Sequence, residues 1–227
     1  MLKNFFLTIG FIALLYWLLA YQILPRFWRD LEPDPRFNSE PKITHTKEGI
    51  PGDPINVVLA GTQEELVQAM HKAGWFPANA LTFKTAAKIV KSALFKKPYP
   101  KAPVSNLYFF GRKEDLTFEQ PAAENIKKRH HVRFWQSDTR WKETKPVWLG
   151  AATFDTSYGF SRYTGQILHH IDADIDAERG KLFSDLENAN EILLRYQASG
   201  IGPTLSGRNG EGDRYYTDGM IDVGILR

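Results

Sequence analysis

The chain of 227 residues contains no cysteine and little net charge, and both features narrow what it can do. Without cysteine it has no disulfide, no thiolate nucleophile, no iron–sulfur cluster and no zinc site built on thiolates. Its 29 Lys and Arg side chains stand against 26 Asp and Glu side chains, which leaves a net charge of +3. This balance excludes a strongly basic nucleic-acid-binding protein, so we expect no nucleic-acid partner, and it also excludes an acidic disordered chain.

Charge is missing most completely near the N-terminus, where residues 5–24 (FFLTIGFIALLYWLLAYQIL) carry no charged side chain. As a helix this run would extend about 30 Å, the thickness of a bilayer's hydrocarbon core. The run is longer than the apolar part of a typical signal peptide, and residues 25–28 (PRFW) offer no small-residue cleavage motif. We therefore expect residues 1–24 to form an uncleaved, single-pass transmembrane anchor.

Basic residues on either side of this run bear on its orientation. Only Lys3 precedes the run, whereas Arg26, Arg29 and Arg36 follow it, and this count favours a cytoplasmic domain. A short N-terminal tail with one lysine, however, commonly stays inside while the remainder of a signal-anchor protein is exported. We expect the globular domain to lie on the extracytoplasmic side.

Proline is concentrated directly after the anchor, because residues 25–54 hold six of the chain's 13 prolines. Proline lacks a backbone donor and fixes φ, so this composition forbids a regular helix and favours extended chain. The spacing predicts a proline-rich linker over residues 25–54 and a globular domain over residues 55–227.

The globular part alternates β-rich runs with a few helical patterns. Strands are expected at residues 55–60, 106–110, 116–119, 129–136, 147–154, 191–197 and 220–226. Helices are expected after Thr62, which has capping-box spacing with Glu65, and at residues 83–95 and 174–189. The glycine-rich segment after residue 200 reads as a connection. The pattern predicts an α+β domain with a mostly antiparallel sheet and a few packed helices, preceded by one transmembrane helix.

Two histidine pairs are the feature of the sequence that most suggests a catalytic or metal-binding site. They lie in RHHVRFW at residues 129–135 and in HHIDADIDAER at residues 169–179. In a strand over residues 129–135, alternation places His131 and Arg133 on one face and His130 on the other. At most one histidine of each pair therefore enters a given site.

One interpretation is a divalent-metal site for zinc, manganese or iron, made from one imidazole of each pair and an aspartate. The candidate metal ligands are His131, His169, His170, Asp172 and Asp174. The candidate catalytic or substrate-binding residues are Arg133, Glu178 and Arg179. A metal-activated water would make such a site a hydrolase acting on an anionic, phosphoester-like substrate.

The other interpretation is a structural polar network, in which histidines satisfy buried hydrogen bonds and the aspartates cap a helix. We favour this interpretation, because no complete catalytic motif is present. Residues 159–163 lack the second glycine of a G-x-S-x-G nucleophile elbow, and no phosphate-binding P-loop occurs.

Five ordered motifs stand out in the globular part: LYFFGR at 107–112, FEQP at 118–121, RHHVRFW at 129–135, WLGAATFD at 148–155 and HHIDADIDAER at 169–179. Together they resemble the LssY-type C-terminal domain of bacterial proteins. The resemblance covers roughly residues 50–226. It implies a bacterial membrane setting and supplies no established activity.

Together these features predict a membrane-anchored accessory or binding module without enzymatic activity, serving an envelope, lipid or export system. Its expected partners are the membrane and envelope or export proteins. The alternative is the metal-dependent hydrolase described above.

Overall fold

The computed structural model describes residues 2–24, 43–47, 49–78, 106–122, 128–163, 165, 167–199 and 205–227. The expected helix at 83–95 and the first part of the expected linker, residues 25–42, lie outside these residues. The helical elements are α1 (Leu2–Leu18), which continues into the π-helical η1 (Leu19–Ile23), α3 (Gln63–Lys72) and α5 (Ile175–Asn188).

Most of the domain is β-sheet. The first strands are β1 (Ile43–His45), β2 (Pro51–Pro54), β3 (Val57–Ala60), β4 (Phe76–Pro77), β5 (Tyr108–Phe109), β6 (Arg112–Lys113) and β7 (Leu116–Pro121). The later strands are β8 (Arg129–Trp141), β9 (Lys145–Phe160), β10 (Ile167–Ile171), β11 (Ile192–Ser199), β12 (Ser206–Arg208), β13 (Arg214–Tyr216) and β14 (Met220–Leu226). The fold is α+β with mostly antiparallel sheets and one N-terminal apolar helix, as the sequence predicts.

The main sheet has the strand order β11-β14-β3-β9-β8-β7-β4, with β10 paired to β9. The pairing of β14 with β3 is parallel, and the other pairings described in this sheet are antiparallel. A second sheet has the order β2-β1-β5-β6, and β12 pairs with β13. Part of the stretch expected as linker is therefore strand, because β1 and β2 lie within residues 43–54. Prolines fit in β2 because β2 is an edge strand, where a backbone donor is dispensable.

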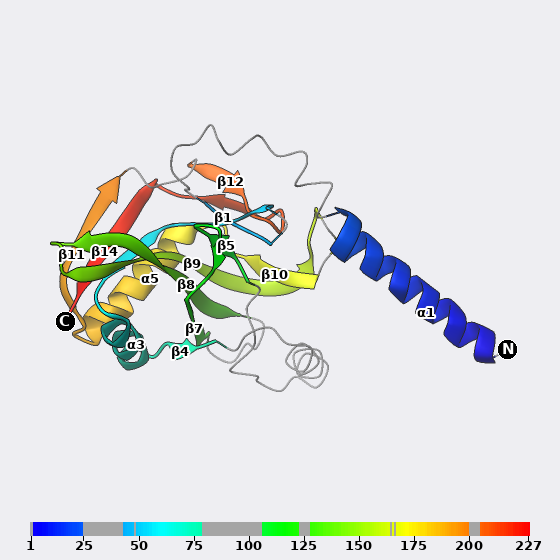
Figure 1. Ribbon diagram of the computed structural model, residues 1–227, viewed down its shortest axis with the longest axis horizontal. Coiled ribbons are helices and arrows are strands. Elements are labelled where there is room, and N and C mark those ends of the chain that lie inside the picture. Colours follow the sequence, from blue (N-terminus) through cyan, green and yellow to red (C-terminus); the bar gives the residue numbers. More distant parts are fainter. Residues whose placement is uncertain are drawn as a thin grey trace.

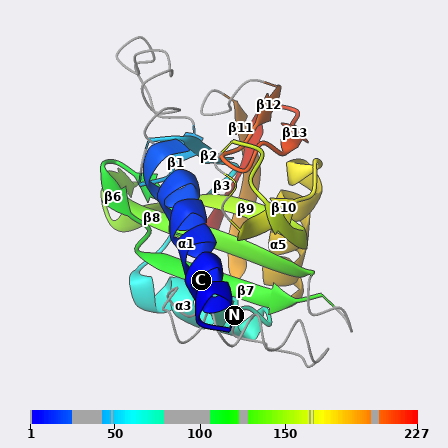
Figure 2. The ribbon, with the colours of Figure 1, turned by 90° about the vertical axis from the view of Figure 1, so that its right-hand side faces the viewer.

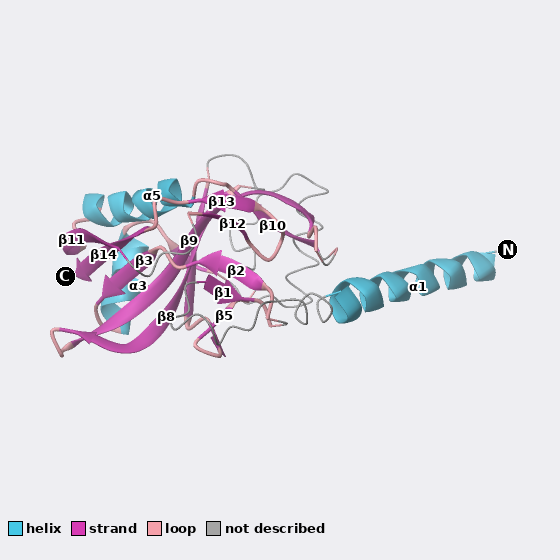
Figure 3. Cartoon of the chain, turned by 90° about the horizontal axis from the view of Figure 1, so that it is seen from above, coloured by secondary structure: helices cyan, strands magenta, loops and turns pink. Residues whose placement is uncertain are grey.

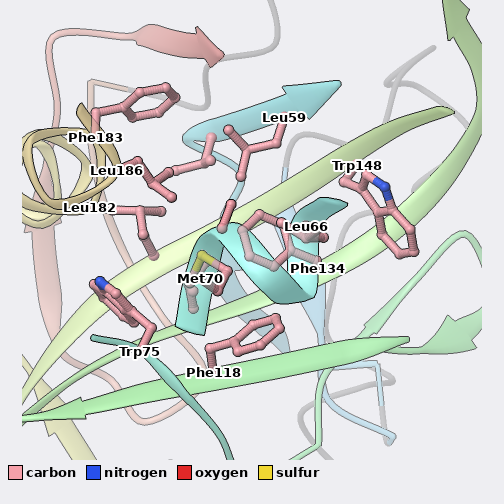
Figure 4. Packing of buried hydrophobic residues seen from close by; sticks show 14 of the residues in the cluster. Leu59, Leu66, Met70, Trp75, Phe118, Phe134, Trp148, Leu182, Phe183 and Leu186 are labelled. Carbon is pink, nitrogen blue, oxygen red and sulfur yellow. The ribbon is translucent and has the colours of Figure 1, made fainter. Parts of the chain in front are cut away.

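One face of the main sheet is covered by α3 and α5. Their buried residues Leu66, Met70, Leu182 and Leu186 pack against a set of aromatic side chains from the sheet (Figure 4). That aromatic set includes Phe118, Phe134 and Trp148. The capping box is formed as predicted, because the Thr62 side chain accepts from the Glu65 N–H and the Glu65 carboxylate accepts from the Thr62 N–H.

The opposite face of the main sheet packs against the second sheet. Here Trp135 of β8 meets Phe109 of β5 at a ring-centroid distance of 5.7 Å, within a second apolar cluster that includes Leu107 and Ile221. Figure 3 shows α5 on one side of the main sheet and β1, β2 and β5 on the other. The central strands of the main sheet are thus buried on both faces, and their polar side chains need partners inside the protein.

The anchor helix projects from the domain, with the N-terminus at its far end (Figure 1). Figure 2 views the domain from the side on which α1 projects. Residues Phe6–Ile23 are long and apolar enough to cross a membrane, and nearly all of this stretch is exposed.

Candidate functional site

Strand β8 divides its charged residues between the two faces of the main sheet, as alternation predicts. Val132 and Phe134 belong to the cluster under the helices, whereas Trp135 belongs to the cluster under the second sheet. His131 and Arg133 lie on the face of Trp135. We call the group on this face the buried cluster; it comprises Asp53, Glu119, Arg129, His131, Arg133, Asp155 and His169.

Arg129 lies at the centre of one half of the buried cluster. Its Nε donates to Asp155 Oδ2 at 2.8 Å, and its Nη1 donates to Glu119 Oε2 at 2.9 Å. Its Nη2 lies 3.0 Å from His169 Nε2. The β-ladder explains this geometry, because Arg129 is directly opposite Asp155 on β9, and Glu119 comes from the other neighbour, β7. One guanidinium on β8 therefore contacts residues of three other strands, β7, β9 and β10.

His131 lies between Asp155, the partner of Arg129, and Arg133, the second arginine of the cluster. Its Nδ1 lies 3.0 Å from Asp155 Oδ1, and its Nε2 lies 2.8 Å from both Arg133 Nη1 and Thr153 Oγ1. Because a guanidinium only donates, the Nε2 atom accepts, and the ring proton is placed on Nδ1 toward Asp155. Burial lowers the pKa of His131, and the contacts of Asp155 with His131, His169 and Arg129 outweigh its burial and hold the pKa of that carboxyl well below its usual range. His131 is thus a neutral imidazole between a carboxylate and an arginine.

Arg133 continues the network to the second sheet. Its Nη1 donates to Asp53 Oδ2 of β2 at 2.8 Å, and Asn209 Nδ2 lies 3.5 Å from Asp53 Oδ1. Nearby Glu211 has its pKa raised to about 8 by burial and by the charge of Asp53. Residues 205–216, expected as a connection, instead form the β12–β13 hairpin that closes this end of the cluster.

His169 completes the cluster from β10, where the pairing register with β9 shifts between His170 and Ile171. Its Nε2 lies 3.8 Å from Asp155 Oδ2 as well as 3.0 Å from Arg129. Burial is the largest cause that lowers its pKa to about 3, and Arg129 acts in the same direction. The two carboxylates that pair with Arg129 differ in pKa. The pKa of Asp155 is lowered, whereas burial raises the pKa of Glu119 to about 7 despite its ion pair with Arg129.

The structure brings together one histidine from each pair, but with Asp155 as the shared carboxylate in place of Asp172 or Asp174. Asp172 Oδ1 accepts from the Asp174 N–H at 3.0 Å, and Asp174 caps α5 by accepting from the Ala177 N–H at 3.0 Å. His170 pairs instead with Asp213, at 2.8 Å. These three candidates make their contacts away from the buried cluster.

The remaining candidates, Glu178 and Arg179, hold α5 onto the sheet. Glu178 Oε2 lies 2.7 Å from His130 Nδ1 on the helix-covered face of the sheet. Burial raises the pKa of Glu178. Arg179 bonds to Asp176 and Asp218 at 3.0 and 2.9 Å, and its Nε lies 3.5 Å from Asp222 Oδ1 of β14. Both residues therefore have a structural role in docking the helix.

The histidines and carboxylates of the buried cluster are not arranged as a metal centre. Within the described parts of the chain, no group of three or more His, Asp or Glu side chains is arranged to hold a metal ion. The Nε2 atoms of both histidines face the guanidinium groups of Arg129 and Arg133, and His131 Nδ1 faces the carboxylate of Asp155. A cation at either nitrogen would also be repelled by the arginine.

The order Asp155, His131 and Thr153 resembles the carboxylate, base and hydroxyl of a nucleophilic triad. Thr153 has no exposed surface and lies in the interior of β9, directly opposite His131 of β8. A substrate cannot approach its hydroxyl, so the arrangement serves as a hydrogen-bonded link between strands.

Four cluster residues escaped the sequence analysis as site candidates: Asp53, Glu119, Arg129 and Asp155. Three of them fall in the family-like motifs at 118–121, 129–135 and 148–155, where a charged residue interrupts an apolar strand. That interruption is the signal that could have identified them. Asp53 has no comparable signal, because it lies among prolines.

The structure is that of an α+β domain behind an apolar helix. A buried cluster of arginines and histidines lies across the central strands of this domain. The chain belongs to the family described as LssY C-terminus, whose family model matches residues 37–221. No curated protein and no solved structure matches the chain.

Proposed function

We propose that this protein is a single-pass membrane protein whose LssY domain is a non-enzymatic accessory or binding module of an envelope, lipid or export system. The domain lies on the extracytoplasmic side. The apolar helix Phe6–Ile23 supports the anchoring, because its side chains point outward from the protein and require an apolar environment.

One observation carries the non-enzymatic part of the proposal. The charged and histidine side chains of the buried cluster are one another's partners. Arg129 pairs with Glu119 and Asp155, and Arg133 pairs with Asp53 and His131. A general base or metal ligand must instead present a lone pair to a substrate or ion. The alternative, a divalent-metal-dependent hydrolase of phosphoester-like substrates, would require both arginines to leave the histidine nitrogens and their buried carboxylates.

A comparison of the full chain with its anchor tests this proposal. Both are tagged at the C-terminus, the control consisting of residues 1–42 and the tag, and proteins that co-purify from solubilised membranes are quantified. We expect a defined set of envelope proteins to require the domain. The proposal is overturned if no protein distinguishes the full chain from the anchor and the full chain hydrolyses p-nitrophenyl phosphate in a reaction that His131→Ala abolishes.

A further inference from the structure

A polar pocket lies where β8 departs from its regular pairing with β9. Ser137 is directly opposite Val147 and Arg140 is directly opposite Pro146, so three steps along β8 correspond to one step along β9. The two extra residues, 138 and 139, form a β-bulge, which takes their side chains out of the regular alternation. At this bulge the protein has a pocket of about 320 Å³, which is large enough for a small molecule.

A second wall of this pocket comes from β6 and the segment after it, which contribute Arg112 and Asp115. The Arg112 guanidinium donates to the Asp115 carboxylate and to the Gln136 carbonyl, and the same carboxylate accepts from the Gln136 N–H at 2.7 Å. The Trp135 indole donates to the Arg112 carbonyl at 3.3 Å, and Figure 2 shows β6 beside β8. Arg112 and Asp115 are therefore held in place by β8, and they neutralise each other's charge.

The bulge itself contributes two opposite charges that are not paired with each other. Asp138 and Arg140 are both exposed, and neither makes an ion pair with another residue in the described part of the chain. Arg140 Nη1 donates to the Thr144 carbonyl at 3.3 Å, which leaves the other guanidinium donors available. The hydroxyl-bearing residues Ser137 and Thr139 line the same pocket. The pocket thus offers a cationic group and an anionic group to a ligand.

A ligand that satisfies both groups must carry charges of both signs. A plain anion at Arg140 would be repelled by Asp138, and a plain cation at Asp138 would be repelled by Arg140. Seven of the eight residues that line the pocket are polar or charged, with Pro146 as the exception, so the ligand has no large apolar part. Carboxylate and phosphate are the anionic groups whose geometry matches a guanidinium.

We infer that this pocket is a binding site for a small zwitterion, with a carboxylate or phosphate group at Arg140 and an ammonium group at Asp138. Arg112 provides a second guanidinium in the same pocket, positioned by its ion pair with Asp115. A free molecule and a zwitterionic lipid headgroup share this chemistry. The inference goes beyond the proposed function, because a small ligand binds here whether or not the domain also recruits envelope proteins.

Calorimetric titration of the purified full chain in a nonionic detergent tests the inference. The zwitterionic probes are O-phosphoethanolamine and β-alanine, and the probes with charge of one sign are inorganic phosphate, acetate and ethanolamine. Asp138→Asn and Arg140→Gln each remove one charge from the pocket. Lys142→Gln is the matched control, because Lys142 is an exposed charged residue of the same β8–β9 hairpin and lies outside the set of residues that line the pocket.

We expect a zwitterionic probe to bind more tightly than every probe with charge of one sign, by about ten-fold or more. Each pocket variant should weaken this binding by a similar factor, and Lys142→Gln should leave it unchanged. The inference is overturned if neither zwitterion binds, if a probe with charge of one sign binds as tightly, or if either folded pocket variant binds like the wild type. Thermal unfolding shows whether each variant is folded, and should one of them fail to fold, the other decides.

A second titration separates the two sources of the zwitterion. The full chain is reconstituted in vesicles of phosphatidylglycerol with or without phosphatidylethanolamine, and the zwitterionic probe that binds in detergent is titrated into both. Weaker binding in the presence of phosphatidylethanolamine identifies a lipid headgroup as the ligand, and equal binding identifies a free molecule.

Discussion

Arg129 Nε lies 2.8 Å from Asp155 Oδ2, and the two residues are direct partners across the β8–β9 ladder. The pair is nearly inaccessible to water, and the same guanidinium serves Glu119 on the other side. The charged residues of the family motifs therefore connect β7, β8, β9 and β10 through contacts with Arg129.

Removal of Arg129 should therefore destabilise the fold strongly. Arg129→Met leaves the buried carboxylates of Glu119 and Asp155 without their cation, which costs about 3–5 kcal/mol in comparable buried pairs. Arg140→Met, on the exposed part of β8, makes the same substitution and should change the stability by less than about 1 kcal/mol. Thermal and denaturant unfolding of the full chain in detergent compares the two. Equal losses of stability would show that the cluster contributes no more than a surface pair.

His169 should make stability depend on pH. Its pKa in the folded protein is about 3, well below the ordinary value of 6.5, so the unfolded chain binds a proton that the folded chain refuses. Stability is then lost as the pH falls from 6.5 toward 3, by at most ~1.4 kcal/mol per pH unit. Glu119, with its pKa raised to about 7, works in the opposite direction between about pH 4.5 and 7, in the wild type and the variant alike.

His169→Gln isolates this effect, since its amide oxygen can still accept from Arg129 and does not titrate. The thermal midpoint of the wild type should fall more steeply between pH 6.5 and 4.5 than that of the variant. Parallel profiles would mean that His169 is protonated as easily in the folded protein as in the unfolded chain.

Gly150 should be intolerant of a side chain. A Cβ at this position would lie 2.7 Å from Phe134 Cε1 and 3.2 Å from Val57 Cβ, inside the core shown in Figure 4. Gly150→Ala is expected to cost about 1–3 kcal/mol through overpacking. Gly180→Ala is the control, because a Cβ there has no neighbour within 4 Å and alanine favours a helix. A variant Gly150→Ala as stable as the control would mean that the strands separate readily at this point.

The sidedness of the domain is open to a reporter fused after Arg227, an exposed residue at the C-terminal end of the chain. An extracytoplasmic domain should make a periplasmic alkaline phosphatase fusion active and leave a green fluorescent protein fusion dark. The reverse pair of results would place the domain in the cytoplasm and show that the arginines after the anchor decide its orientation.

Local patterns predicted local structure well. The period of two in RHHVRFW assigned His131 and Arg133 to one face, and Thr62 with Glu65 marked the start of α3, because both features depend on neighbours in sequence. The partners of Arg129 were not predictable in this way. They depend on the register of β7, β8 and β9, which spacing along a single strand does not contain.

Two sequence patterns allowed more than one use of the same residues. Asp172 and Asp174 were considered as metal ligands, but they form the start of α5, a use that competes for the same oxygen atoms. Pro51 and Pro54 suggested a linker, although an edge strand tolerates proline. In each case the tertiary context selected between two uses that the residue type allows.

The metal content of the full chain tests the central claim most directly. The wild type and His131→Ala are purified from membranes without a chelator, and zinc, manganese and iron are measured per chain by elemental analysis. The account predicts far less than one metal ion per chain in both proteins, because arginines face the histidine nitrogens. One tightly held ion per wild-type chain that is lost in His131→Ala would contradict it and favour the metal-dependent hydrolase.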